Sequence, residues 1–188
     1  MSITKEEVKP ILKKIESMPF GANESAKKAV LKAYEGWKEL FALMEREGNF
    51  ADGLGLDDYE DVVNEHAYDA LDSLNNSGCY EQKLELLENL LKVQYSDYAH
   101  ELNMENFYRE MSDTYARMGN LEKASSMYED ALKKDPLWGW GWIGYLRFLA
   151  WHKEEDLPKT LEEVKAKIAA GEKFRDLEDL KDSVKNDF

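Results

Sequence analysis

The chain has 188 residues, 43% of them hydrophobic, with a net charge of −14, one cysteine and three histidines. This composition supplies a hydrophobic core but excludes an internal disulfide and a Cys/His zinc site, and the negative charge argues against binding nucleic acid or anionic membranes. No apolar run approaches the roughly 18 residues of a membrane span, and the N-terminus has no signal-peptide pattern. We therefore expect a soluble, cytoplasmic protein that needs no metal and no cofactor.

Apolar residues recur at spacings of three and four along the whole chain, which is the period of amphipathic helices. The pattern predicts an all-α fold of about nine helices, stacked as antiparallel hairpins in a short tetratricopeptide-like solenoid. We expect residues 1–188 to form a single domain with one core.

Residues 1–48 are predicted to form a helical pair. Pro10 should kink or start the first helix. The second should run from about Asn23 to Gly48, with an apolar stripe from Ala26 to Met44 that includes Ala29. A degenerate hairpin is predicted over residues 57–95.

Residues 105–136 carry the best repeat. The tetratricopeptide pattern places large, small and aromatic residues at fixed positions of two helices, with a turn between them. Here the turn is Gly119-Asn120, and the residues in those positions are Tyr108, Met111, Ser112, Tyr115, Ala124, Tyr128, Ala131 and Pro136. Small side chains at Ser112, Ala124 and Ala131 would let the two helices approach closely.

A further hairpin is predicted over residues 137–170, and a capping helix over 172–188. Asp135-Pro136 is a candidate start for the first helix of this hairpin, because proline is tolerated at a first helical position. The second helix is expected from Thr160, with a capping box to Glu163, after an irregular turn through Leu157-Pro158.

The run from Asp135 to Gly144, DPLWGWGWIG, follows the tetratricopeptide-like hairpin. Because this run follows the hairpin, the chain resembles bacterial proteins in which such a repeat region accompanies a SEC-C zinc motif. The resemblance covers roughly residues 60–150. The resemblance implies an adaptor role. The zinc motif itself is absent, so no zinc-dependent function is implied.

The inner face of the repeats supplies the candidate binding residues Asn106, Arg109, Asp113, Trp140 and Arg147. Arginine and tryptophan are enriched at binding hot spots, and a partner segment with a carboxylate would suit the two arginines. Trp138 and Trp142 are expected in the core. The alternative for Trp140 is that the C-terminal helix covers it while Arg147 pairs with a local acid.

No catalytic motif is complete, so we do not expect an enzyme. The favoured function is a non-catalytic adaptor that binds proteins or peptides on a helical-repeat surface. The alternative is an inhibitor that blocks a basic, nucleic-acid-binding site on another protein. It rests on residues 45–72, which hold ten acids and one arginine, and its candidate contacts are Asp57, Asp58, Glu60 and Asp61.

Overall fold

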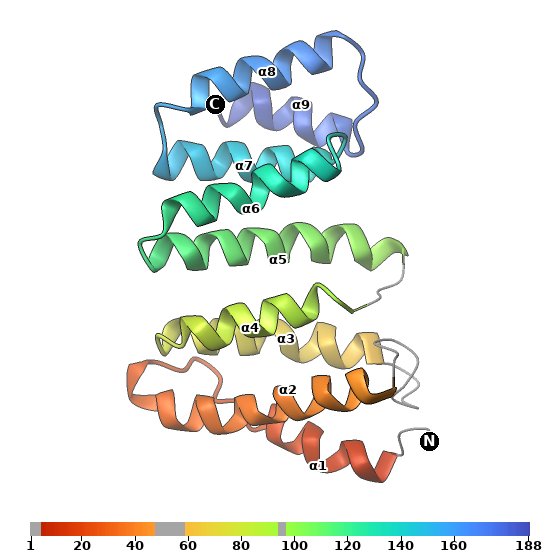
Figure 1. Cartoon of the computed structure of the whole chain (residues 1–188), viewed down its shortest axis with the longest axis vertical. Coiled ribbons are helices and arrows are strands. Elements are labelled where there is room, and N and C mark those ends of the chain that lie inside the picture. Colours follow the sequence, from red (N-terminus) through yellow and green to blue (C-terminus); the bar gives the residue numbers. More distant parts are fainter. Residues whose placement is uncertain (1–4, 48–58, 94–96) are drawn as a thin grey trace. The chain divides into compact units, whose positions relative to one another are not determined.

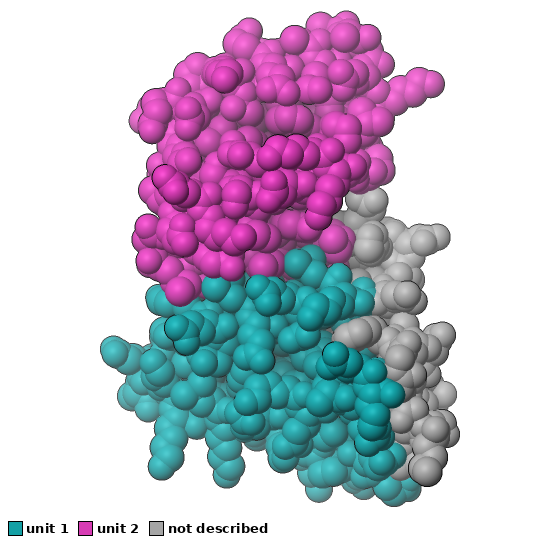
Figure 2. Space-filling model, viewed as in Figure 1, with its two compact units in different colours: residues 1–101 teal, residues 102–188 magenta. Residues whose placement is uncertain are grey.

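The computed structural model describes residues 5–47, 59–93 and 97–188, and for a few residues at helix ends it describes the backbone alone. Within these ranges the chain forms nine α-helices, one 3-10 turn and no strand (Figure 1), which confirms the predicted all-α class. No helix among the described residues combines the length and the apolar character that crossing a bilayer requires. The chain divides into two compact units, Met1–Glu101 and Leu102–Phe188 (Figure 2). The single domain stays a prediction.

The first unit begins with a helical hairpin, α1 (Lys5–Glu16) and α2 (Lys27–Glu47), joined by the short turn η1 (Glu24–Ala26). Pro10 lies inside α1, so the helix neither starts there nor ends. Asn23 begins the second segment as predicted, because its side chain accepts a hydrogen bond from Ser25 N at 3.0 Å. The predicted stripe of α2 is buried from Val30 to Met44, but Ala29 is exposed and its assignment to the core was wrong.

A second hairpin, α3 (Tyr59–Asn76) and α4 (Tyr80–Leu90), follows in this unit. Gly78 has a φ of +65°, the left-handed conformation that commonly follows a helix and that glycine adopts without strain. Leu74, Leu87 and Leu90 are fully buried in the core of this unit.

The second unit takes α5 (Asp97–Arg117) from Leu102 onward and pairs it with α6 (Leu121–Lys134). The predicted turn is confirmed: Gly119 has a φ of +79°, and Asn120 caps α6 by accepting a hydrogen bond from Lys123 N at 3.1 Å. The Ser112 hydroxyl donates to the Ala124 carbonyl at 3.1 Å. The small residues therefore bring the two helices together as expected, although α5 begins earlier than residue 105.

The next helix, α7 (Gly139–His152), starts four residues after the predicted Asp135. The prediction of an N-cap was wrong because Asp135 serves two other contacts. Its N–H donates to Ala131 O at the end of α6, and its carboxylate pairs with Arg175 at 2.5 Å. Arg175 N also donates to Leu137 O at 2.9 Å, and this contact holds residues 135–138 in a turn.

Helix α8 (Leu157–Ala169) starts three residues before the predicted Thr160. Pro158 lies in its first turn, where its fixed φ and missing N–H suit a helix start. The Thr160 hydroxyl donates to the Asp156 carbonyl at 3.2 Å, as it does inside a helix, so the predicted capping box with Glu163 was wrong.

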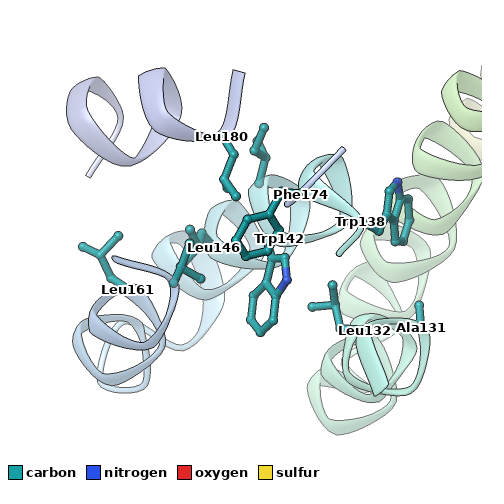
Figure 3. Close-up of a cluster of buried hydrophobic side chains, with 10 residues drawn as sticks. Ala131, Leu132, Trp138, Trp142, Leu146, Leu161, Phe174 and Leu180 are labelled. Atoms are coloured by element: carbon teal, nitrogen blue, oxygen red, sulfur yellow. The ribbon is translucent and has the colours of Figure 1, made fainter. Parts of the chain in front are cut away.

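Helix α7 packs against α6, α8 and α9 (Leu177–Asn186), which explains why it is apolar on most of its surface. Trp138 and Trp142 are buried in the core of this unit, as predicted, with Leu132, Leu146, Phe174 and Leu180 (Figure 3). The indole Nε1 of Trp142 donates to Pro136 O at 2.9 Å.

Candidate functional site

A cavity of about 230 Å³ lies between the faces of α5 and α7, and we call it the arginine cavity. Helical spacing explains its composition. On α5 the side chains at 109 and 113 are one turn apart, and on α7 those at 144, 147 and 151 recur every three or four residues. The cavity is lined by Arg109, Asp113, Tyr128, Gly144, Arg147, Phe148 and Trp151.

The floor of the arginine cavity depends on Gly144. A Cβ atom at this position would lie 2.8 Å from the hydroxyl of Tyr128, so any larger residue would displace the phenol. Tyr128 is almost completely buried, and burial raises its pKa well above the ordinary value for a tyrosine. The hydroxyl is therefore neutral and can donate or accept a hydrogen bond at the floor.

Arg109 is held by its own helix. It donates to Asn106 Oδ1 at 2.8 Å, and its Nε lies 3.6 Å from the carboxylate of Glu105. The Glu105 side chain is only 9% exposed, and burial raises its pKa, although the positive charges of Arg109 and Arg147 act in the opposite direction. The nearly buried carboxylate of Glu105 thus orients the guanidinium of Arg109, which stays partly exposed.

Arg147 is held by the last helix of the chain. Its guanidinium donates to Asp187 Oδ2 at 3.0 Å, and the Ser183 hydroxyl donates to the same oxygen at 2.8 Å. The hydrogen bond from Ser183, followed by that from Arg147, lowers the pKa of Asp187. The local acid that the alternative for Arg147 required is therefore present.

Trp140 lies outside the arginine cavity. It is half-buried against the core and, with Ile143 and Arg147, lines a separate cavity of about 240 Å³ whose other wall is α9. Of the five predicted residues, Arg109, Asp113 and Arg147 share the arginine cavity, Asn106 contacts Arg109, and Trp140 faces α9.

Trp151 was missed by the sequence analysis, although it lines the same cavity as both arginines and is 75% exposed. Its signal was present in the sequence, because residue 151 follows Arg147 by one helical turn. Glu105 was also missed, although it precedes Arg109 by one helical turn on α5.

The acidic alternative cannot be placed on the structure. Asp57 and Asp58 lie outside the described residues, and Glu60 and Asp61 belong to α3 with only their backbone described. Within the described part of the chain, no group of three or more His, Cys, Asp or Glu side chains is arranged to hold a metal ion. Cys79 is buried, and burial raises the pKa of its thiol.

Comparisons with protein families, with curated proteins and with solved structures found no match to this chain. The resemblance to the repeat region of SEC-C proteins thus stays a prediction.

Proposed function

We propose that the chain is a non-catalytic adaptor, and that it binds a protein segment in the arginine cavity. One observation carries this proposal: two of the five arginines of the chain, from different helices, line one cavity beside the exposed ring of Trp151. Guanidinium groups bind carboxylates through paired hydrogen bonds, and a large exposed aromatic side chain buries much area on contact. The expected partner segment carries a carboxylate next to an apolar residue.

The ion pair between Arg147 and Asp187 does not prevent this binding. The side chains of Arg147 and Asp187 are 46% and 39% exposed, and an exposed ion pair of this kind stabilises a protein by about 0–1 kcal/mol. A carboxylate from a partner can replace Asp187 at little cost. Trp151 needs no rearrangement, because most of its surface already faces solvent.

The hairpin of α5 and α6, with its glycine turn and its small residues at the helix contact, supports a tetratricopeptide-like repeat of the bacterial kind. We propose that the protein performs this function in the cytoplasm. A helical-repeat surface that presents one arginine on each of two successive first helices suits the capture of an extended segment.

The proposal is tested by selecting a library of random short peptides on the immobilised full-length protein. We expect enrichment of peptides with Asp, Glu or a free C-terminal carboxylate beside an apolar residue. The double variant Arg147→Ala with Trp151→Ala should lose these peptides while its circular dichroism stays helical, because both side chains are exposed.

Arg117→Ala is the matched control, since this arginine lies on α5 but does not line the cavity. Neutralising Asp57, Asp58, Glu60 and Asp61 together should also leave the selection unchanged. If that quadruple variant loses binding and the double variant keeps it, the arginine cavity is not the binding site and the acidic inhibitor is favoured.

A further inference from the structure

A second cavity, of about 450 Å³, lies between α6, α7 and α8. Its volume falls within the range of about 300–1,000 Å³ that is usual for small-molecule sites. Trp142 and Tyr145 face it from α7, whereas Gly144 and Arg147 face the arginine cavity from the other side of the same helix. The two cavities are therefore separate surfaces.

A carboxylate is fixed at the wall of this second cavity. Glu129 Oε1 accepts hydrogen bonds from the Ser125 hydroxyl at 2.8 Å and from the Tyr145 hydroxyl at 2.9 Å. The bond from Ser125 contributes most to a lowered pKa of Glu129, and the bond from Tyr145 adds to it, so the carboxylate is ionised near neutral pH. Both bonds use Oε1, and Oε2 accepts no hydrogen bond from the described residues.

The other charged groups of the cavity fall into two kinds. Lys133 is paired with Asp130 at 3.2 Å, and Lys167 lies 4.0 Å from Glu163, which also lines the cavity, and 3.7 Å from Glu172. By contrast, Asp156 and Lys159, at the beginning of α8, form no ion pair with any described side chain. The beginning of α8 thus offers the cavity one carboxylate and one ammonium group that are outside any ion pair of the described residues, whereas the Glu129 carboxylate is within electrostatic reach of Lys133 and Lys153.

The remaining wall is mainly apolar, although the Lys167 ammonium lies 5.9 Å from the centroid of the Trp142 ring. Leu132, Pro136 and the ring of Trp142 form it, and the hydrogen bond from Trp142 Nε1 to Pro136 O fixes the indole. Such a surface can hold the carbon chain of a small ligand between the charged groups at its ends.

We propose that this cavity binds a small zwitterion of the size and chemistry of a free amino acid. The ammonium group of the ligand donates to Glu129 Oε2 and lies near Asp156, the carbon chain packs on Trp142, and the carboxylate pairs with Lys159. A simple anion would meet the carboxylates of Glu129, Asp156 and Glu163, and a simple cation would leave Lys159 without a counterion. A ligand that carries both charges can pair its ammonium group with the carboxylates and its own carboxylate with Lys159.

The test is isothermal titration calorimetry of the full-length protein with each of the common L-amino acids. The best ligand is then compared with its N-acetyl derivative, which lacks the ammonium group, and with its amide, which lacks the carboxylate. We expect each derivative to bind at least about tenfold more weakly, because each loses one charge-assisted hydrogen bond.

Variants assign the two ends of the ligand. Glu129→Gln should weaken binding of the amino acid about tenfold but should weaken binding of the N-acetyl derivative little, and Lys159→Met should show the reverse preference, sparing the amide. Glu178→Gln and Lys181→Met on α9, outside the cavity, are the matched controls. Lys159 is exposed, so its variant keeps the test decisive if Glu129→Gln fails to fold.

Absence of binding by every amino acid would overturn the proposal. So would an amide that binds as well as its parent amino acid, because a peptide terminus or a simple amine would then be the better ligand. These outcomes leave the adaptor function untouched, since its variants lie in the other cavity.

Discussion

At the scale of single residues, polar contacts in the second unit are built around fixed carboxylates. Glu105 and Glu129 lie on neighbouring helices but have opposite environments. Burial raises the pKa of Glu105, whereas two hydroxyl donors lower the pKa of Glu129. Burial also raises the pKa of Tyr145 to about 12, so this hydroxyl keeps its proton and remains a donor to Glu129. Glu129 therefore contributes to folding in its ionised form.

This contribution predicts a pH-dependent effect of Tyr145→Phe. A carboxylate whose pKa is lower in the folded state stabilises the fold at pH values above its unfolded pKa, and this stabilisation disappears as the pH falls through the folded pKa. We expect the substitution to lower the free energy of unfolding by about 1–3 kcal/mol at neutral pH, the usual range for a hydrogen bond to a charged group. The loss should shrink in acid, as Glu129 becomes protonated.

Urea unfolding at a series of pH values measures this effect. Tyr108→Phe is the control, because Tyr108 is half-buried in the same unit and packs its ring against Trp138. The cost of the control substitution should not change over the acidic range. A cost of Tyr145→Phe that is equally constant would show that the hydroxyl does not act through Glu129.

At the scale of elements, helix existence followed from the sequence, but several helix starts did not. Helices α7, α8 and α9 begin at Gly139, Leu157 and Leu177, whereas the sequence predicted starts at Asp135, Thr160 and residue 172. Asp135-Pro136 and Thr160/Glu163 are valid local start signals. The first was overridden because Asp135 pairs with Arg175, forty residues later, and the second because Pro158 starts α8 one turn earlier. The local pattern around Asp135 contains no information on such a distant contact, whereas Pro158 was itself a local start signal.

The candidate site, too, was only partly predictable from the sequence. The repeat frame and the helical period were sufficient to bring Arg109 and Arg147 to one face. The helical period would also have identified Trp151, because this residue follows Arg147 by one turn on α7. The sequence left two alternatives open for Trp140, and it could not decide for the position against α9, because this position depends on how the last helix docks.

The packing of α9 leads to a prediction about which of its contacts, the buried Leu180 or the ion pair of Asp187, stabilises its position. Leu180 is fully buried in the core cluster, so Leu180→Ala should lower the free energy of unfolding by about 2–5 kcal/mol. Asp187→Asn removes the exposed ion pair with Arg147, while the amide oxygen can still accept the hydrogen bond from Ser183, so this variant should cost much less than Leu180→Ala. Chemical denaturation of the two variants compares the contributions directly. If Asp187→Asn is as costly as Leu180→Ala, Arg147 is a structural residue and is not available to a partner.

At the scale of the whole molecule, the division at residue 101 falls inside α5 and separates two groups of helices that each have buried apolar residues. In the second unit the core includes Trp142, Leu146 and Leu180, and α5 contributes the contact from Ser112 to Ala124. Both candidate cavities are lined only by residues of this unit. The proposed binding functions therefore require only the second unit to be folded.

We accordingly expect residues 97–188, produced as a fragment, to fold without the rest of the chain. The fragment contains the whole of α5 and the four helices after it, so it keeps the hydrogen bond between Ser112 and Ala124 and both cavities. Circular dichroism should show a helical protein with a cooperative thermal transition, because the apolar core of this unit is retained. The shorter fragment 121–188 is the control. It lacks α5, leaves Ala124 and Tyr128 uncovered on that side, and should melt at a lower temperature or without cooperativity. A fragment 97–188 that is unfolded would contradict this prediction and would support the single domain expected from the sequence, in which the core of each half depends on the other.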